Sequence, residues 1–268
     1  MKRWIAVFLV AAMMLGCASA LAEGTLRVGM DCNYAPYNWT QTEPSEFTVP
    51  IEGGMGYADG YDVQIAKIIA EGLGMDLVIV KTEWEGLPVG VQSGILDAII
   101  AGMSPTEPRK ETLDFSDAYY QCELVVVVRK EGPYANAKTL ADLSGARITA
   151  QLSTFHYEVI DQIPGVEKVT AMETFPAMVV ATRAEAVDGY VAERPGAVAD
   201  CIANPDLTYI VFDEGQGFTA SLDDTAIAVG LQKGSPLTEQ INAILAQVDE
   251  ETRLQLMLDA TDRQPLNN

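Results

Sequence analysis

The sequence predicts an α/β protein of two lobes joined by two crossing segments. Short apolar segments typical of strands alternate with segments of helical periodicity along most of the chain. The alternation starts again after residue 121, and a late strand-like segment, 225–231, is expected to return the chain to the first lobe. We therefore assign residues 23–121 and 225–268 to lobe 1 and residues 122–224 to lobe 2.

Residues 1–22 have the features of a signal peptide for secretion. Lys2 and Arg3 precede an apolar run, and small residues precede Glu23. The mature chain is expected to begin near Glu23 and to work outside the cytoplasm, in the periplasm or at the cell surface. Two alternatives stay open, because the Leu-Gly-Cys that ends at Cys17 resembles a lipidation motif and because an uncleaved leader would anchor the chain in the membrane.

Composition excludes several classes of partner. The formal net charge of −21 argues against nucleic acid and against an anionic membrane surface. The single histidine and the scattered cysteines form no pattern of metal ligands, so we expect neither metal nor cofactor. Cys32, Cys122 and Cys201 allow one disulfide, whose pairing the spacing leaves open.

Lobe 1 is expected to hold parallel strands joined by helices. Its predicted strands are 26–30, 77–81 and 98–101, its predicted helices 60–72 and 87–93, and the polar stretch 40–59 is an excursion or hairpin. Loops carrying Asp31 with Tyr34, Trp84, and Ser104 with Arg109 follow the three strands. Because such loops gather at one edge of a parallel sheet, their side chains can converge on one ligand.

Lobe 2 repeats the alternation. A run of valines predicts that the strand 123–130 is buried on both faces. Strands are then expected at 146–150, 166–170, 188–192 and 207–212, and helices at 139–143, 155–163, 174–185 and 195–203. After the return strand, helices are expected from residue 235 and over 251–260.

The segment 97–109 predicts a receptor for a small carboxylate. A short strand ends at Gly102, and the chain passes Ser104 into a helix start at residues 106–108. Arg109 then falls in the first helical turn, where backbone N–H groups have no partner within the helix. Its planar guanidinium can hold both oxygens of a carboxylate, which a lysine cannot do.

Four motifs together resemble a known family. They are Tyr34-Ala35-Pro36-Tyr37, Gly60-Tyr61-Asp62-Val63-Gln64-Ile65, residues 97–109, and Phe115-Ser116-Asp117-Ala118-Tyr119-Tyr120. Their order and spacing over 25–260 resemble the extracytoplasmic polar amino-acid-binding proteins of ABC importers. The resemblance implies the two-lobed periplasmic-binding-protein fold of type II.

The resemblance also implies residue roles. Gly102, Met103 and Ser104 would present backbone groups to the α-carboxylate and α-ammonium, and Arg109 would bind the carboxylate. In lobe 2, Glu193 would bind the α-ammonium, while the turn with Thr154 and Phe155 would donate amides to the carboxylate. Tyr34 and Trp84 would sandwich the ligand side chain, and Asp31 would hold the cationic end of a basic ligand.

Some positions depart from the family pattern. Gln64 stands where the family commonly has an acidic residue, and Glu193 where it more often has the shorter aspartate. Ser153 stands where the family usually has glycine, and Phe155 replaces a residue with a hydroxyl group. The turn of lobe 2 is therefore expected to contribute main-chain N–H groups only. His156 is expected to be a surface or capping residue.

We expect a monomeric binding protein, not an enzyme, that captures arginine or lysine by lobe closure and delivers it to a membrane permease. Asp31, the two aromatic residues and the acidic composition favour a basic ligand. The alternatives are a polar uncharged amino acid, glutamine or cystine, and a cyclohexadienyl or arogenate dehydratase in which Glu193 acts as acid or base. A sensor domain is disfavoured, because no membrane helix or signalling module follows in the sequence.

Overall fold

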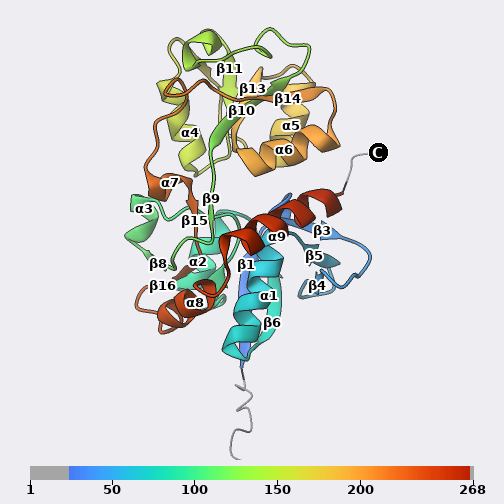
Figure 1. Cartoon of the computed structure of the whole chain (residues 1–268), viewed down its shortest axis with the longest axis vertical. Helices are drawn as coiled ribbons and strands as arrows, with labels where there is room; N and C mark the ends of the chain where they lie inside the picture. Colours follow the sequence, from blue (N-terminus) through green and yellow to red (C-terminus); the bar gives the residue numbers. More distant parts are fainter. Residues whose placement is uncertain (1–23, 266–268) are drawn as a thin grey trace, which may run out of the picture.

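The computed structural model describes residues 24–265 and has two α/β lobes, one above the other in Figure 1. Each lobe is built on a five-stranded sheet, as the repeated alternation of strands and helices predicts. The expected signal peptide and Cys17 lie outside the described residues. Within residues 24–265, no helix is long and apolar enough to span a membrane.

The sheet of lobe 1 is parallel at one side and antiparallel at the other. Strand β1 pairs in parallel with β6 and β7, and β16 pairs antiparallel with β7 and β8. The carboxyl ends of β1, β6 and β7 therefore lie at one edge, as predicted. The strand order is β6 (Asp76–Lys81), β1 (Thr25–Met30), β7 (Ala98–Ile99), β16 (Gly230–Gln232) and β8 (Leu113–Phe115).

Helices α1 and α2 connect these parallel strands. They span Tyr61–Leu73 and Gly86–Gln92. Gly60, just before α1, has a φ of 132°, and a Cβ there would lie 2.2 Å from the carbonyl oxygen of Tyr37. Only glycine fits this turn, which brings the loop after β1 against the start of α1. The next helix, α3 (Glu107–Lys110), has only four residues, so the helix expected there is a single turn.

The excursion 40–59 and the residues just before it form a small antiparallel sheet, which packs beside the main sheet of lobe 1. Its strands are β2 (Asn33–Tyr34), β3 (Asn38–Gln41), β5 (Tyr57–Asp59) and β4 (Val49–Pro50), in that order. This sheet holds the loop with Tyr34 in place, because β2 is its first strand and pairs Tyr34 with Asn38.

The sheet of lobe 2 has β10 near its middle. This strand pairs antiparallel with β13 and β14, and residues Val125–Val128 are fully buried, as the run of valines predicts. The strand order is β12 (Glu167–Lys168), β11 (Arg147–Thr149), β13 (Gly189–Glu193), β10 (Leu124–Arg129) and β14 (Leu207–Ile210).

Helices pack on both faces of this second sheet. They are α4 (Phe155–Val159), α5 (Phe175–Arg183) and α6 (Arg194–Ala203), with short 3₁₀ turns η1 (Leu140–Leu143) and η2 (Ile160–Gln162). The helix expected over 155–163 is therefore shorter, since a 3₁₀ turn follows Val159. The helix expected over 139–143 is a 3₁₀ turn.

Two crossing segments join the lobes. They are the antiparallel strands β9 (Tyr120–Gln121) and β15 (Ala226–Ile227), and the short helix α7 (Leu222–Thr225) precedes β15. The single strand expected over 225–231 is thus wrong. The chain changes partners at Ala228, whose N–H donates to the carbonyl of Met103, so that β15 pairs with β9 whereas β16 joins the sheet of lobe 1.

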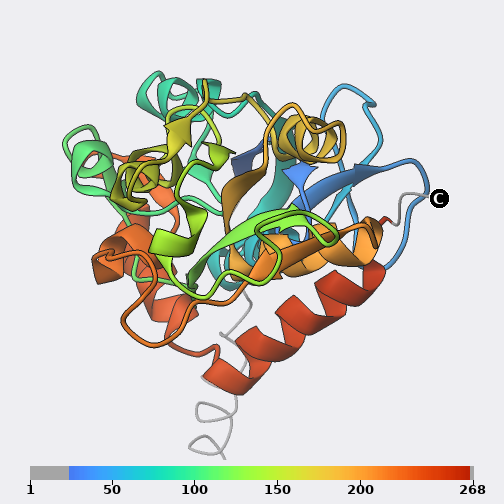
Figure 2. The same cartoon turned by 90° about the horizontal axis from the view of Figure 1, so that it is seen from above.

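The last two helices cover lobe 1. Helix α8 (Leu237–Leu245) packs against α1, and α9 (Glu250–Arg263) runs diagonally from the side of α1 towards α6 of lobe 2 (Figure 1). From above, α9 lies along one outer side of the molecule (Figure 2). Gln264, directly after α9, donates through its side-chain amide to the carbonyl of Ala199 in α6.

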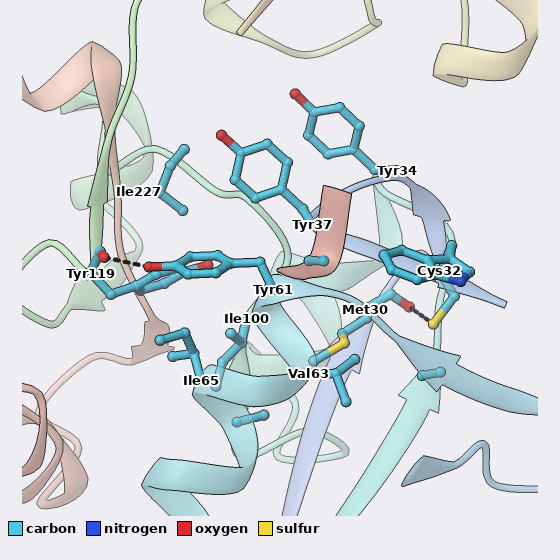
Figure 3. Packing of buried hydrophobic residues seen from close by; sticks show 14 of the residues in the cluster. Met30, Cys32, Tyr34, Tyr37, Tyr61, Val63, Ile65, Ile100, Tyr119 and Ile227 are labelled. Atoms are coloured by element: carbon cyan, nitrogen blue, oxygen red, sulfur yellow. Dashed lines mark hydrogen bonds between the residues drawn. The ribbon is translucent and has the colours of Figure 1, made fainter. Parts of the chain in front are cut away.

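The core of lobe 1 extends without a break to the space between the lobes. Tyr61 and Tyr37 are fully buried, and the Tyr61 hydroxyl donates to the carbonyl of Tyr119 (2.9 Å; Figure 3). Tyr37 lies between Tyr61 and Tyr34 in this view, and its ring contacts both of theirs. Tyr34 therefore stands on a rigid aromatic base where the first lobe faces the second.

Candidate functional site

One small cavity lies where the carboxyl ends of the lobe 1 strands meet lobe 2. The loops after β1, β6 and β7 provide one wall, and the turn before α4, the start of α5 and the end of β13 provide the other. Its lining residues are Asp31, Tyr34, Trp84, Gly102, Ser104, Arg109, Gln151, Thr154, Phe155, His156, Phe175 and Glu193.

Arg109 bridges the two lobes at this cavity. Its guanidinium donates to the carbonyl of Ser104 in lobe 1 (3.0 Å) and to the carbonyl of Ser153 in lobe 2 (3.2 Å). The ring of Trp84 lies beside it, with the guanidinium carbon 5.1 Å from the ring centroid. Burial lowers the pKa of Arg109 to about 10, so the side chain still carries its charge at neutral pH.

Glu193 ends β13 and is almost completely buried. One carboxylate oxygen, Oε1, lies 3.0 Å from Nε2 of His156, and the other accepts a hydrogen bond from the hydroxyl of Tyr34. Burial raises the pKa of Glu193, but the interactions with His156 and with the hydroxyl of Tyr34 outweigh it and leave the pKa lowered. The carboxylate therefore stays ionised inside the protein.

Asp31 follows β1 and is also buried. Its carboxyl accepts a hydrogen bond from the backbone N–H of Asn33, while its Oδ1 has no partner in the protein. Burial, helped by the nearby charge of Asp62, raises the pKa of Asp31 to about 7. An unpaired buried carboxylate is costly, so this position favours either a proton or a cationic partner.

The aromatic residues are arranged differently from a simple sandwich of Tyr34 and Trp84. The ring of Tyr34 stacks on Phe175 of lobe 2 at 4.0 Å between centroids, and on Tyr37 at 4.9 Å. Trp84 instead packs against Arg109. The ring of Tyr34 thus reaches from lobe 1 to lobe 2. There it lies so close to Gly196 that a Cβ at this position would clash with the ring edge at 2.9 Å.

The turn before α4 lies at the opening between the lobes. Ser153, with a φ of 58°, donates its hydroxyl to Oε1 of Glu85 across this opening (2.8 Å). Phe155 and His156 line the cavity. His156 is 8 % exposed, so the surface position expected for it was wrong.

Of the predicted site residues, only Met103 does not line the cavity. Its side chain packs into the core beside Leu87 and Leu113, whereas the neighbouring residues Gly102 and Ser104 line the cavity. Gln151, His156 and Phe175 line the cavity although the sequence did not single them out as ligand contacts. Each stands at or near the start of a helix that follows a lobe 2 strand, which is the signal that would have found them.

The arrangement suits a small zwitterion. Arg109 and Glu193 place opposite charges in one cavity. Within residues 24–265, no group of three or more His, Cys, Asp or Glu side chains could hold a metal ion. Cys32, Cys122 and Cys201 are free thiols in the structure.

Known proteins resemble this chain over most of its length. A "Probable histidine-binding protein" of Campylobacter jejuni is 28% identical, covering 83% of this chain and 87% of that protein. The "L-cystine-binding protein TcyJ" of Escherichia coli is 27% identical, covering 88% of this chain and 81% of that protein. A solved amino acid ABC transporter substrate-binding protein of Streptococcus pneumoniae, bound to L-arginine, is 26% identical with a TM-score of 0.76 and covers 89% of this chain and 94% of that one.

A family model matches the chain as well. The model describes the bacterial extracellular solute-binding proteins, family 3, and it matches residues 26–260, nearly the whole range over which the four motifs show their resemblance. The two-lobed fold predicted from the sequence is the fold of the solved relative. The chain belongs to the bacterial extracellular solute-binding proteins, family 3.

Proposed function

We propose that the protein binds a free L-amino acid between its lobes, outside the cytoplasm, and delivers it to the permease of an ABC importer. The single observation that carries this proposal is that Arg109 of lobe 1 and Glu193 of lobe 2 line the same cavity. A zwitterion that leaves water needs a partner for each charge, because an unpaired buried charge costs several kcal/mol. Contacts to both lobes would make the bound ligand favour the closed arrangement.

Arg109 and Glu193 keep their predicted roles in this proposal. Arg109, with backbone groups of Gly102 and Ser104 and the turn at Thr154 and Phe155, would hold the α-carboxylate, since a guanidinium can donate two parallel hydrogen bonds. Glu193 would hold the α-ammonium.

The boundaries between the lobes are placed at 121/122 and 224/225, close to the paired crossing strands.

Arginine or lysine is the preferred ligand in this proposal. The support is Asp31, a buried carboxyl with an oxygen that has no protein partner and that lies on the same cavity as Arg109 and Glu193. A side-chain cation would supply the missing partner and would stabilise the ionised form of Asp31. Relatives whose names specify histidine and cystine leave a polar uncharged amino acid as the second choice.

A panel of thermal shifts with the twenty amino acids tests the proposal. Binding at 100 times the dissociation constant adds about 2.7 kcal/mol to the free energy of unfolding, so a true ligand raises the melting temperature by several degrees. Arginine and lysine are expected to give the largest shifts. Stabilisation by glutamine or cystine but not by arginine or lysine would remove the basic ligand, and stabilisation by no amino acid would remove the function.

The proposal includes binding without chemistry. Ligand recovered from the complex after denaturation should be unchanged, and prephenate and arogenate should survive incubation with the protein. Conversion of either compound by the wild-type protein, lost in Glu193→Gln, would instead establish a dehydratase. Monomeric behaviour in size-exclusion chromatography with light scattering is expected in both the presence and the absence of ligand.

A further inference from the structure

Two residues that line the cavity each have a buried side-chain atom without a hydrogen-bond partner in the protein. Among the buried side-chain atoms of residues 24–265, those without a partner are Asp31 Oδ1, His156 Nδ1 and the hydroxyl oxygen of Tyr37. Tyr37 does not line the cavity, whereas Asp31 and His156 both do. Buried polar atoms are rarely left unpaired, so unpaired atoms on the wall of a binding cavity indicate partners on the ligand.

The orientation of the His156 ring is fixed by Glu193. Nε2 lies 3.0 Å from Oε1 of the carboxylate, which can only accept a hydrogen bond while it is ionised. Nε2 must therefore carry the proton in the neutral imidazole, and Nδ1 is left with a lone pair. In that form, the free nitrogen of His156 is an acceptor for an N–H group.

We propose that His156 is a further ligand-binding residue, whose Nδ1 accepts a hydrogen bond from an N–H group of the bound amino acid while Nε2 holds Glu193 in position. This inference rests on the proposed function and narrows it. Together, His156, Glu193 and Asp31 give one cavity three acceptors for N–H donors. Such a set suits an amino acid with nitrogen donors at both ends better than one with a single ammonium group.

The same contact makes binding depend on a nitrogen donor of the ligand. With Nε2 directed at Glu193, Nδ1 can only accept a hydrogen bond, so it needs an N–H group and gains nothing from a ligand oxygen. Loss of this acceptor leaves the ligand N–H without a partner, which lowers the affinity.

Two substitutions distinguish the ligand contact from a structural role. His156→Leu removes both nitrogens, and His156→Gln keeps a carbonyl acceptor that does not titrate. Tyr157→Phe, on the same helix but outside the cavity lining, is the matched control. Each variant is first checked for the wild-type circular dichroism spectrum and for a cooperative unfolding transition.

Isothermal titration with arginine at pH 8 measures the effect. His156→Leu should bind about ten-fold more weakly than wild type, as for a buried hydrogen-bonding group left unpaired, and His156→Gln within about three-fold of wild type, because its carbonyl keeps the acceptor. Tyr157→Phe should bind like wild type.

Two results overturn the inference. One is a His156→Leu variant that binds like wild type, and the other is a folded His156→Gln variant that binds arginine about ten-fold or more weakly than wild type. If His156→Leu does not fold, the affinity of His156→Gln alone decides. A wild-type protein that binds no amino acid at all would instead refute the proposed function, so the two failures can be told apart.

Discussion

At the scale of single residues, Arg109 connects the two lobes at the cavity. It donates to one carbonyl in each lobe and packs against Trp84. Arg109→Lys keeps the charge but loses the planar fork, so it cannot hold both carbonyls and a ligand carboxylate at once. We expect the dissociation constant for the ligand to rise more than about 100-fold in titration calorimetry.

Lys233 provides a control for this substitution. Lys233 pairs with Asp114, also in lobe 1, and does not line the cavity. Lys233→Ala should therefore bind the ligand as tightly as wild type. An Arg109→Lys protein that keeps wild-type affinity would show that the guanidinium only ties the lobes together and does not bind the carboxylate.

Asp31 leads to a prediction about ligand preference. Since the pKa of this buried carboxyl is raised to about 7, it ionises fully only above neutral pH. The affinity for arginine relative to glutamine should fall as the pH drops from 8 to 6, because protonation removes the anion that would face the side-chain cation. Asp31→Asn should abolish this trend in calorimetric titrations, and a ratio that stays constant in the wild type would contradict the role of Asp31.

The raised pKa of Asp31 also affects the stability of the protein. Its effect on the free energy of unfolding runs with pH in the opposite direction from that of an aspartate whose pKa is lowered on folding. The folded protein holds the Asp31 proton up to a pH of about 7, whereas the unfolded chain releases it near the usual pKa of 3.8. Between these values the folded state binds more protons, so the free energy of unfolding falls as the pH rises. Asp31→Asn should weaken this fall in urea titrations from pH 4 to pH 8, and an unchanged slope would mean that Asp31 ionises freely.

Sequence reasoning found much of the site at this scale. Asp31, Trp84 and Arg109 follow strand ends of a parallel sheet, where the topology alone brings loops together. His156 and Phe175 were missed because their positions depend on how the second lobe meets the first. Their places at helix starts after lobe 2 strands mark them as candidates, but no local pattern in the sequence shows which of these starts meets lobe 1.

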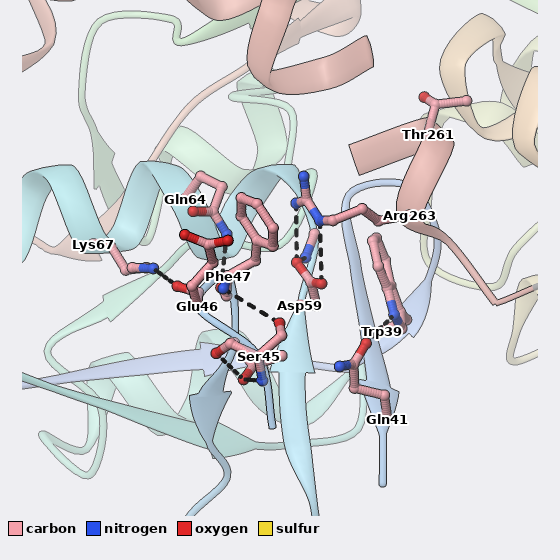
Figure 4. A network of polar contacts seen from close by, with 12 residues as sticks. Trp39, Gln41, Ser45, Glu46, Phe47, Asp59, Gln64, Lys67, Thr261 and Arg263 are labelled. Atoms are coloured by element: carbon pink, nitrogen blue, oxygen red, sulfur yellow. Dashed lines mark hydrogen bonds and ion pairs between the residues drawn. The ribbon is translucent and has the colours of Figure 1, made fainter. Parts of the chain in front are cut away.

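At the scale of elements, α9 is held by one buried ion pair. Arg263, in the last turn of α9, donates to both oxygens of Asp59 on β5, and its guanidinium lies 4.0 Å from the ring centroid of Phe47 (Figure 4). The Asp59 side chain is 2 % exposed. Helix α9 thereby fastens the small sheet to the body of lobe 1.

Arg263→Ala should lower the free energy of unfolding by about 3 kcal/mol, because it leaves the carboxylate of Asp59 buried without a cation. Urea denaturation followed by circular dichroism measures the change. The double variant with Asp59→Asn should recover part of the loss, since no unpaired charge then remains. A double variant that is as unstable as the sum of both single variants would show that the pair does not interact.

The elements themselves were predicted well where local signals are strong. The run of valines predicts the buried strand β10, and the glycine before α1 marks the start of that helix. The return segment 225–231 was read as one strand, because its alternation is continuous although its hydrogen-bonding partners change at Ala228. Strand partners are a property of the tertiary fold, which explains this error.

At the scale of the whole molecule, the two lobes are held together partly by the protein's own contacts. Ser153 donates to Glu85, Arg109 donates to the carbonyl of Ser153, and the hydroxyl of Tyr34 donates to Glu193. Each contact joins lobe 1 to lobe 2. The closed arrangement is thus favoured both by these contacts and by whatever ligand contacts both lobes, and the two contributions add to the same equilibrium.

The contact between Ser153 and Glu85 can be removed without touching the cavity, because Glu85 does not line it. Its removal therefore measures how much the protein's own contacts stabilise the closed arrangement. Glu85→Ala should therefore raise the dissociation constant of the ligand by a few-fold, mainly through faster dissociation, since a less stable closed state opens more often. Stopped-flow release of ligand measures the rate, and Glu83→Ala, two residues earlier in the same loop, is the control. If dissociation were unchanged in Glu85→Ala while Arg109→Lys still lost binding, the ligand alone would hold the lobes closed, and the contacts at the opening would be a consequence of closure with no part in its energetics.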